Sequence, residues 1–228
     1  MREIRAKYPN LEIESCSGGG GRVDLGILGL TDEVWTSDNT DPFDRLAIQD
    51  GFTYACSPGV MMAWVTDSGS GVNDRVSALD YRFLVAMQGS LGIGANLNKW
   101  APEDFATAKQ LIADYKQIRE TVQHGSLYRL ISPQHDSESS ATESVSLDRT
   151  QAVLFTFLHS SQERNPYPTL YLRGLDPDRQ YSLNTLGDAR GKAAPTSASG
   201  RYWMQYGITP LLNGDFKAAA FILTATAR

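Results

Sequence analysis

Two neighbouring stretches decide the fold expected of this chain: Glu14-Ser15-Cys16-Ser17-Gly18-Gly19-Gly20-Gly21-Arg22-Val23-Asp24 and Trp35-Thr36-Ser37-Asp38-Asn39-Thr40-Asp41. Each joins the end of an apolar run to polar groups of catalytic type. The glycine run removes side chains, so backbone amides can approach a ligand closely. The second stretch places carboxylates after a β-branched and aromatic run. Together they predict one wall of a ligand pocket, built at the ends of two strands.

Short apolar runs alternate with helical patterns before residue 125. Residues 11–15, 33–37 and 61–65 are predicted strands, with helices between and after them. This alternation is typical of βαβ units and a parallel sheet. One helix begins at Asp41, which can cap it, and Asp44 suits the positive end of its dipole, so both are interpreted as structural. The clearest helix is predicted over residues 102–123, where apolar side chains share one face and Gly125 follows the end.

The pattern after Gly125 is that of antiparallel strands. They are predicted over residues 152–159, 169–172, 180–183, 201–206 and 218–224. Polar stretches of small residues, 136–146 and 187–200, are predicted surface loops. The sequence therefore predicts two domains, residues 1–124 and 125–228.

Composition excludes several classes of partner. The chain has 228 residues and a formal net charge of -5, which argues against binding to nucleic acid or to an anionic membrane surface. No run approaches the roughly 20 apolar residues of a membrane helix, and the first five residues lack the apolar core of a signal peptide. A cytoplasmic location is expected, although a truncated N-terminus would carry no information about export. Cys16 and Cys56 are too few for a disulfide framework, and unpaired thiols are the favoured interpretation.

Both opening stretches, in this order and at this separation, resemble the bacterial α-galactosidases of glycoside hydrolase family 36. The resemblance continues through residues 79–83, 86–89, 115–119 and 125–130, and becomes looser after about Pro133. It implies an α/β part and an all-β part: the C-terminal portion of a (β/α)8 TIM barrel, followed by an antiparallel β-sandwich domain. In the family these segments lie near the end of a much longer polypeptide. The chain is therefore expected to be a fragment that begins inside the catalytic barrel.

Asp38 is the candidate catalytic acid/base. Barrel active sites lie at the C-terminal ends of the strands, and Asp38 directly follows a predicted strand. From this local pattern alone, a turn residue or a helix cap is the commoner interpretation. The resemblance changes that balance, because the family's acid/base is the first aspartate of the equivalent motif.

The resemblance also implies a substrate-binding wall formed by Cys16, Ser17, Gly18 and Gly19. In the family, the matching cysteine and glycine contact the galactose ring near its 2-hydroxyl, so Cys16 serves recognition and not nucleophilic attack. A flexible loop or a phosphate cradle is the alternative, but the run lacks the Gly-Lys-Ser/Thr ending of a P-loop. Arg22 and Asp24 are interpreted as an ion pair or loop brace. No histidine shows metal-ligand spacing, and neither a metal nor another cofactor is expected.

The family's nucleophile, an aspartate in a Lys-x-Asp setting on an earlier strand, has no counterpart in these residues. The upstream aspartates and tryptophans that bind the sugar's 4- and 6-hydroxyls in the family are missing as well. Asp67 and Glu14 are the only local substitutes. Solvation or hydrogen bonding explains a carboxylate at either position more simply.

The resemblance thus implies retaining hydrolysis of terminal α-linked galactose from oligosaccharides such as melibiose and raffinose, in a complete enzyme expected to be a homo-oligomer. Two related alternatives are galactosyl transfer, as in raffinose or stachyose synthesis, and action on N-acetylgalactosamine; the small Cys16 wall favours a plain 2-hydroxyl. An alternative of another class is an inactive truncated chain that serves as a structural or weak carbohydrate-binding module. Tyr202, Trp203 and Tyr206 are its candidate stacking platform, although aromatic residues in strands more often belong to the core.

Overall fold

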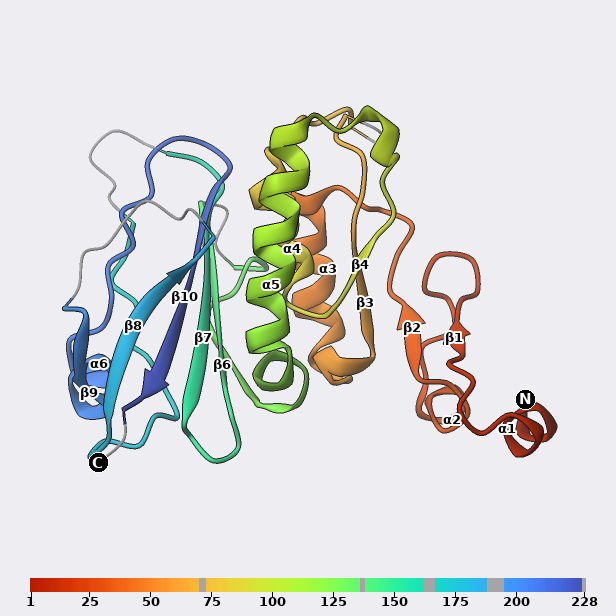
Figure 1. The fold of residues 1–228 in the computed structure, drawn as a ribbon, viewed down its shortest axis with the longest axis horizontal. Helices are drawn as coiled ribbons and strands as arrows, with labels where there is room; N and C mark the ends of the chain where they lie inside the picture. The colour runs from red at the N-terminus through yellow and green to blue at the C-terminus, as the bar shows by residue number, and fades with distance from the viewer. Residues whose placement is uncertain (70–72, 136–137, 162–166, 188–194, 227–228) are drawn as a thin grey trace.

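The computed structural model describes residues 1–69, 73–135, 138–161, 167–187 and 195–226. It has three layers, with the helices α3, α4 and α5 between a parallel sheet and an antiparallel sheet (Figure 1). None of the helices in these ranges is long and apolar enough to cross a membrane.

The parallel sheet has the strand order β1-β2-β3-β4, which is also the order along the chain. Its strands are β1 (Glu14–Ser15), β2 (Glu33–Trp35), β3 (Met61–Val65) and β4 (Ser90–Ile93). All neighbouring pairs are parallel, as the alternation of apolar runs and helical patterns predicts. The connections carry α2 (Leu25–Leu28), α3 (Pro42–Phe52), η1 (Pro58–Val60) and α4 (Leu79–Ala86), and α1 (Arg2–Lys7) precedes β1.

α5 (Pro102–His124), which follows η2 (Leu97–Lys99), matches the predicted long helix closely. The Asp104 carboxylate accepts a hydrogen bond from the backbone N–H of Ala101 at 2.9 Å, which satisfies a free donor at the helix start. Leu111, Tyr115 and Ile118 are buried on one face. That face belongs to a core shared with β3, α4 and the antiparallel sheet, because Val65, Phe83 and Phe157 are in the same cluster.

The antiparallel sheet has the order β5-β6-β7-β10-β8-β9. Its members are β5 (Ser126–Ile131), β6 (Ser139–Val145), β7 (Gln151–Leu158), β8 (Gln180–Leu186), β9 (Ser197–Ser199) and β10 (Lys217–Ala225). One face packs on α4 and α5. The opposite face, with Leu154 and Phe221, is covered by Leu170, Leu172 and Trp203. This confirms an antiparallel β domain after the barrel portion.

Four predictions for this domain are wrong. Residues 139–145 of the expected loop 136–146 form β6, and residues 197–199 of the expected loop 187–200 form β9; positions 136–137 and 188–194 lie outside the described residues. The expected strand 201–206 is instead helix α6 (Gly200–Gln205). The expected strand 169–172 makes a single bridge, between Leu170 and Ile208.

Candidate active site

Asp38 lies just beyond the carboxyl end of β2, and its carboxylate is fixed by a tryptophan from that strand. The indole Nε1–H of Trp35 donates to Asp38 Oδ1 at 2.7 Å. Trp35 is 8% exposed; its ring lies 4.7 Å from that of Trp64 and 5.5 Å from the Arg45 guanidinium. Asp38 itself is exposed. A rigid, buried ring therefore orients a carboxylate that solvent or substrate can reach.

The glycine loop packs directly against this carboxylate. Gly18, Gly19 and Gly20 have φ of +55°, +71° and +96°, a region that side chains other than glycine rarely adopt. A Cβ on Gly19 would lie 2.7 Å from Asp38 Oδ2, and one on Gly20 would lie 2.2 Å from the Thr36 carbonyl oxygen. The glycines are therefore required both by backbone conformation and by close approach. Their packing brings the two opening stretches together.

The two Asp38 oxygens differ in their surroundings. Indole is a hydrogen-bond donor only, so the oxygen it contacts, Oδ1, acts as an acceptor. A proton on this carboxyl group is therefore favoured on Oδ2, the oxygen beside Gly19. Oδ1 is thus occupied by the indole, and Oδ2 faces the glycine loop.

The other residues of the expected wall begin this loop. Cys16 is exposed and Ser17 partly buried, and the Gly21 N–H donates to the Ser17 carbonyl oxygen at 2.8 Å. Cys16 and Cys56 are free thiols. A Cβ on Gly18 would meet no atom within 4 Å. Gly19 is thus the member of the wall with the closest approach to Asp38.

The carboxylates interpreted as structural have that role. Asp41 caps α3: its Oδ1 accepts from the backbone N–H groups of Phe43 and Asp44, both at 3.0 Å. Asp24 caps α2 by accepting from the Ile27 N–H at 2.8 Å. Arg22 and Asp24 form no ion pair within the described ranges, so that interpretation is wrong, and the loop brace stays a prediction.

The two candidate substitutes for the nucleophile have other surroundings. Asp67 Oδ1 accepts from the Asn96 backbone N–H at 3.1 Å, and its Oδ2 lies 3.9 Å from Lys99 Nζ. Glu14 is exposed and pairs with Glu33 in the register of β1 and β2. Burial, and next the nearby Glu14, raise the pKa of Glu33. Within the part of the chain that the structure describes, no hydrogen bond or ion pair places either substitute beside Asp38.

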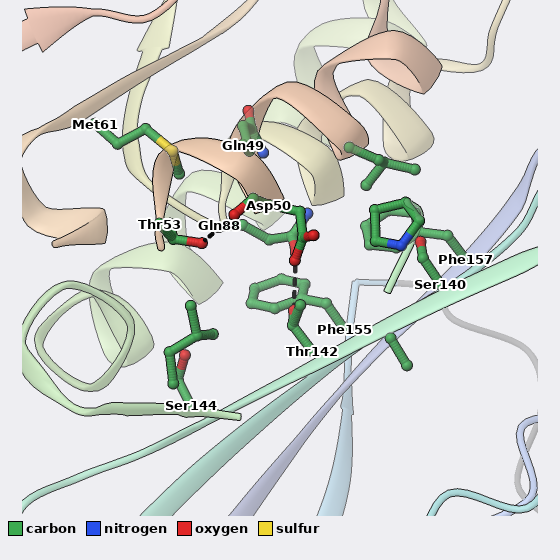
Figure 2. A pocket seen from close by; sticks show the side chains of 14 residues that line it. Gln49, Asp50, Thr53, Met61, Gln88, Ser140, Thr142, Ser144, Phe155 and Phe157 are labelled. Carbon is green, nitrogen blue, oxygen red and sulfur yellow. Dashed lines mark hydrogen bonds between the residues drawn. The ribbon is translucent and has the colours of Figure 1, made fainter. Parts of the chain in front are cut away.

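A small cavity lined by Gln49, Thr142 and Phe155 is not a sugar site. It measures about 30 Å³ and lies between α3 and the antiparallel sheet, where Gln88 Oε1 accepts a hydrogen bond from Thr142 Oγ1 at 2.8 Å (Figure 2). Ligand pockets are on the order of 300 to 1,000 Å³, so this space suits one or two waters. A larger groove of about 660 Å³ between α4, α5 and Leu211 also lacks the predicted site residues. No metal-binding cluster occurs among the residues that the structure describes.

Sequence reasoning missed the residues that hold the site in place. Arg45, 3% exposed, donates to the Met62 carbonyl oxygen at 2.7 Å and to that of Ser37 at 3.4 Å; burial lowers its pKa to about 10. Trp64 lies against β4, since a Cβ on Gly92 or Gly94 would be 2.6 or 2.5 Å from its indole. A charged residue inside a helix and a tryptophan facing glycines leave no local signal of these contacts.

The carboxylate and the glycine loop lie at the carboxyl ends of parallel strands, which is where the active sites of barrel enzymes are found. A family model described as Melibiase matches residues 1–125, and one described as Glycosyl hydrolase family 36 C-terminal domain matches residues 139–223. The chain belongs to the Melibiase family, within glycoside hydrolase family 36. The resemblance inferred from the sequence is thereby confirmed.

Relatives and solved structures agree with this family. Alpha-galactosidase AgaA of Geobacillus stearothermophilus is 38% identical over 187 residues, which cover 82% of this chain and 26% of that protein. Alpha-galactosidase Mel36A of Lactobacillus acidophilus is 34% identical over 97% of this chain and 29% of its own length. The crystal structure of the α-galactosidase from Lactobacillus brevis superposes with a TM-score of 0.91 at 31% identity, over all of this chain and 31% of that one. The chain thus spans between a quarter and a third of these relatives.

Two further solved structures are of AgaA variants, one in complex with raffinose and one in complex with stachyose. Each has a TM-score of 0.90 and 34% identity, and covers 99% of this chain and 30% of the other. They show which oligosaccharides those proteins bind.

Proposed function

We propose that this chain supplies the general acid/base and part of the sugar pocket of a retaining α-galactosidase. The observation that carries the proposal is the packing of the glycine loop against Asp38, with Gly19 beside Oδ2 and the Trp35 indole on Oδ1. The raffinose and stachyose complexes of the AgaA variants support α-galactosides as the substrate class.

In the proposed mechanism Asp38 acts twice. A carboxylate nucleophile attacks C1 of galactose while Asp38 Oδ2 gives its proton to the departing glycosidic oxygen, so a covalent galactosyl-enzyme forms and the aglycone leaves as an alcohol. Asp38, now ionised, then removes a proton from the water that attacks C1. This releases galactose with its configuration retained and restores protonated Asp38. The nucleophile belongs to a segment outside these residues.

Cys16, Ser17, Gly18 and Gly19 are proposed to bind the galactose ring near its 2-hydroxyl. This small wall is proposed to favour a plain 2-hydroxyl over the larger acetamido group of N-acetylgalactosamine. Galactosyl transfer differs from hydrolysis only in the acceptor that replaces water, and it remains the related alternative. The cytoplasmic location and the homo-oligomeric assembly stay predictions from the sequence.

The test is Asp38→Asn in the complete protein that contains this chain. General acid/base catalysis contributes about 10²- to 10⁴-fold, so kcat/KM for raffinose and melibiose should fall by a factor in that range. Full activity of the variant on either sugar would refute the assignment.

The binding-module alternative retains part of its candidate platform. Tyr206, 66% exposed, stacks on Tyr202 with ring centroids 5.0 Å apart, whereas Trp203 is fully buried and belongs to the core. If the exposed pair binds sugar rings, galactose should shift the NMR resonances of Tyr206 in the 228-residue chain. Unchanged resonances at saturating galactose would remove this alternative.

A further inference from the structure

Asp41 and Asp44, which follow Asp38 in the chain, form ion pairs with Arg75. These ion pairs join two loops at the carboxyl ends of the parallel strands. Arg75, in the loop after β3, donates through Nη1 to Asp41 Oδ1 and lies 3.4 Å from Asp44 Oδ1. The Asp41 side chain is only 6% exposed. The carboxylate accepts hydrogen bonds from two backbone amides at the start of α3 and forms an ion pair with Arg75. Loss of the guanidinium would leave this buried negative charge without its positive partner.

The residues on either side of Asp38 are bonded to the same group of side chains. The Asp41 backbone N–H donates to Asn39 Oδ1 at 3.0 Å, and Asn39 Nδ2 donates to Asp44 Oδ2 at 2.8 Å. The Asn39 N–H in turn donates to Ser37 Oγ at 3.1 Å. Arg75 therefore holds the two aspartates that fix Asn39, and Asn39 fixes the turn in which Asp38 stands.

Arg75 is itself held by aromatic rings, one of which comes from the antiparallel domain. Its guanidinium lies 4.7 Å from the ring centroid of Phe43 and 5.5 Å from that of Phe216. Phe216 immediately precedes β10, and its ring packs edge-on against those of Phe43 and Tyr81 at 5.8 and 6.3 Å. A guanidinium can contact two carboxylates and two ring faces at once, which the compact ammonium group of lysine cannot.

We propose that Arg75 is a positioning residue for Asp38, and that Phe216 extends this role to the antiparallel domain by fixing the Arg75 guanidinium. The contacts run from Phe216 to Arg75, then to Asp41 and Asp44, then to Asn39 and the Asp38 turn. The proposal rests on the acid/base role proposed for Asp38. It gives the C-terminal domain an indirect part in proton transfer, because the contacts that begin at Phe216 end at the turn that holds Asp38.

The test uses the complete protein and compares two leaving groups. The variants are Arg75→Gln and Phe216→Ala, with Arg75→Lys and Phe216→Leu as milder changes in case the first two do not fold. The sugar alcohol released from raffinose is a poor leaving group, so its glycosidic oxygen must be protonated as the bond breaks. An acidic phenol released from an aryl α-galactoside can leave as the phenolate without protonation. A misplaced catalytic group costs up to about 10²-fold, so kcat/KM for raffinose should fall about 10- to 100-fold and that for the aryl substrate by less than about threefold.

Arg129→Gln provides the matched control. Arg129 Nε donates to Asp50 Oδ1 at 2.9 Å, and this ion pair also joins α3 to the antiparallel sheet, but at the opposite end of the helix. The variant should lower the unfolding temperature while leaving the ratio of the two kcat/KM values unchanged. Equal losses on both substrates in the Arg75 and Phe216 variants would show a merely structural role and overturn the proposal.

Asp38→Ala, measured alongside, separates this proposal from the proposed function. If Asp38→Ala discriminates between the leaving groups and the Arg75 and Phe216 variants do not, the positioning role fails and the acid/base assignment stands. If Asp38→Ala lowers kcat/KM for both substrates equally, the acid/base assignment itself fails, and the positioning role fails with it.

Discussion

At the scale of single residues, the site depends on what each Asp38 oxygen touches. Trp35 donates a hydrogen bond to Oδ1, and Gly19 packs so closely against Oδ2 that a Cβ there would lie 2.7 Å away. The resemblance to the family pointed to Asp38 and Gly19 through their motifs. It did not reveal Trp35, Arg45 or Arg75 as supports, because these contacts depend on how the strands, the helix and the loops come together in space.

Trp35→Phe should reduce activity while keeping an aromatic ring in place. The change removes the only indole donor recorded on Asp38 within the described residues. A hydrogen bond to a charged group contributes about 1.5 to 3 kcal/mol, so kcat/KM for raffinose should fall about 10-fold or more. The measurement is steady-state kinetics on the complete protein, and an unchanged kcat/KM would show that the bond does not orient Asp38.

Gly19→Ala should impair catalysis far more than Gly18→Ala. Both glycines have positive φ, so both substitutions strain the backbone, but only the methyl group on residue 19 would meet the Asp38 carboxylate, at 2.7 Å. The difference between the two variants therefore isolates the contact with Asp38. We expect at least a 10-fold lower kcat/KM for Gly19→Ala than for Gly18→Ala, in line with the cost of misplacing a catalytic group. Equal losses would mean that backbone strain alone matters.

At the scale of elements, the helices and strands predicted correctly are those in which the apolar residues of the sequence are also the buried residues of the structure. β3 occupies the expected residues 61–65, and α5 ends one residue later than predicted. β3 has an uninterrupted apolar run because Ala63 and Val65 pack against the helices. α5 has a single apolar stripe, and Leu111, Tyr115 and Ile118 of that stripe are buried.

The elements that were not predicted have residue types that are typical of another structure or another degree of burial. β6, Ser-Ser-Ala-Thr-Glu-Ser-Val, is polar and yet nearly fully buried, since helices cover one face of its sheet and loops the other. α6 is rich in aromatic residues, which favour strands. Its caps were the available signal: the Ser199 hydroxyl accepts from the Tyr202 N–H at 3.2 Å, and Gly207 follows with φ +70°.

Glu143 of β6 gives this element a pH-dependent stability. It is fully buried, and its Oε2 accepts from the Arg173 backbone N–H at 2.6 Å. Burial raises its pKa to about 8, from 4.5. Between these values the folded protein keeps a proton that the unfolded chain releases, so the free energy of unfolding falls as pH rises from about 4.5 to 8 and then levels.

Glu143→Gln should abolish this part of the pH dependence. Urea unfolding of both proteins at pH 5 and pH 8 measures it, and only the unmutated protein should lose a few kcal/mol between the two values. Parallel losses in the two proteins would show that Glu143 does not titrate in this range.

At the scale of the whole molecule, one layer of helices packs between the two sheets. α3, α4 and α5 cover the outside of the parallel sheet, and α4 and α5 also pack on the antiparallel sheet, so the two parts share a core (Figure 1). This sharing lets Phe216 of one part contact Arg75 of the other. The contact could not be predicted from the sequence, because 141 positions separate the two residues.

The 228-residue chain alone should not hydrolyse an aryl α-galactoside. Retaining hydrolysis requires a second carboxylate about 5 to 5.5 Å from the acid/base, and neither Asp67 nor Glu14 is brought to Asp38 by a contact in the described residues. The assay compares this chain with its Asp38→Asn variant. Turnover that the substitution removes would show that a nucleophile lies within these residues.

The most direct test of the central claim, that Asp38 is the acid/base, is the product formed when azide is added to Asp38→Ala in the complete protein. Without the base, azide replaces water in the attack on the galactosyl-enzyme, and two inversions give α-galactosyl azide with a rise in rate. This account predicts that product, identified by NMR. β-Galactosyl azide would show a single displacement and make Asp38 the nucleophile, which would contradict the account.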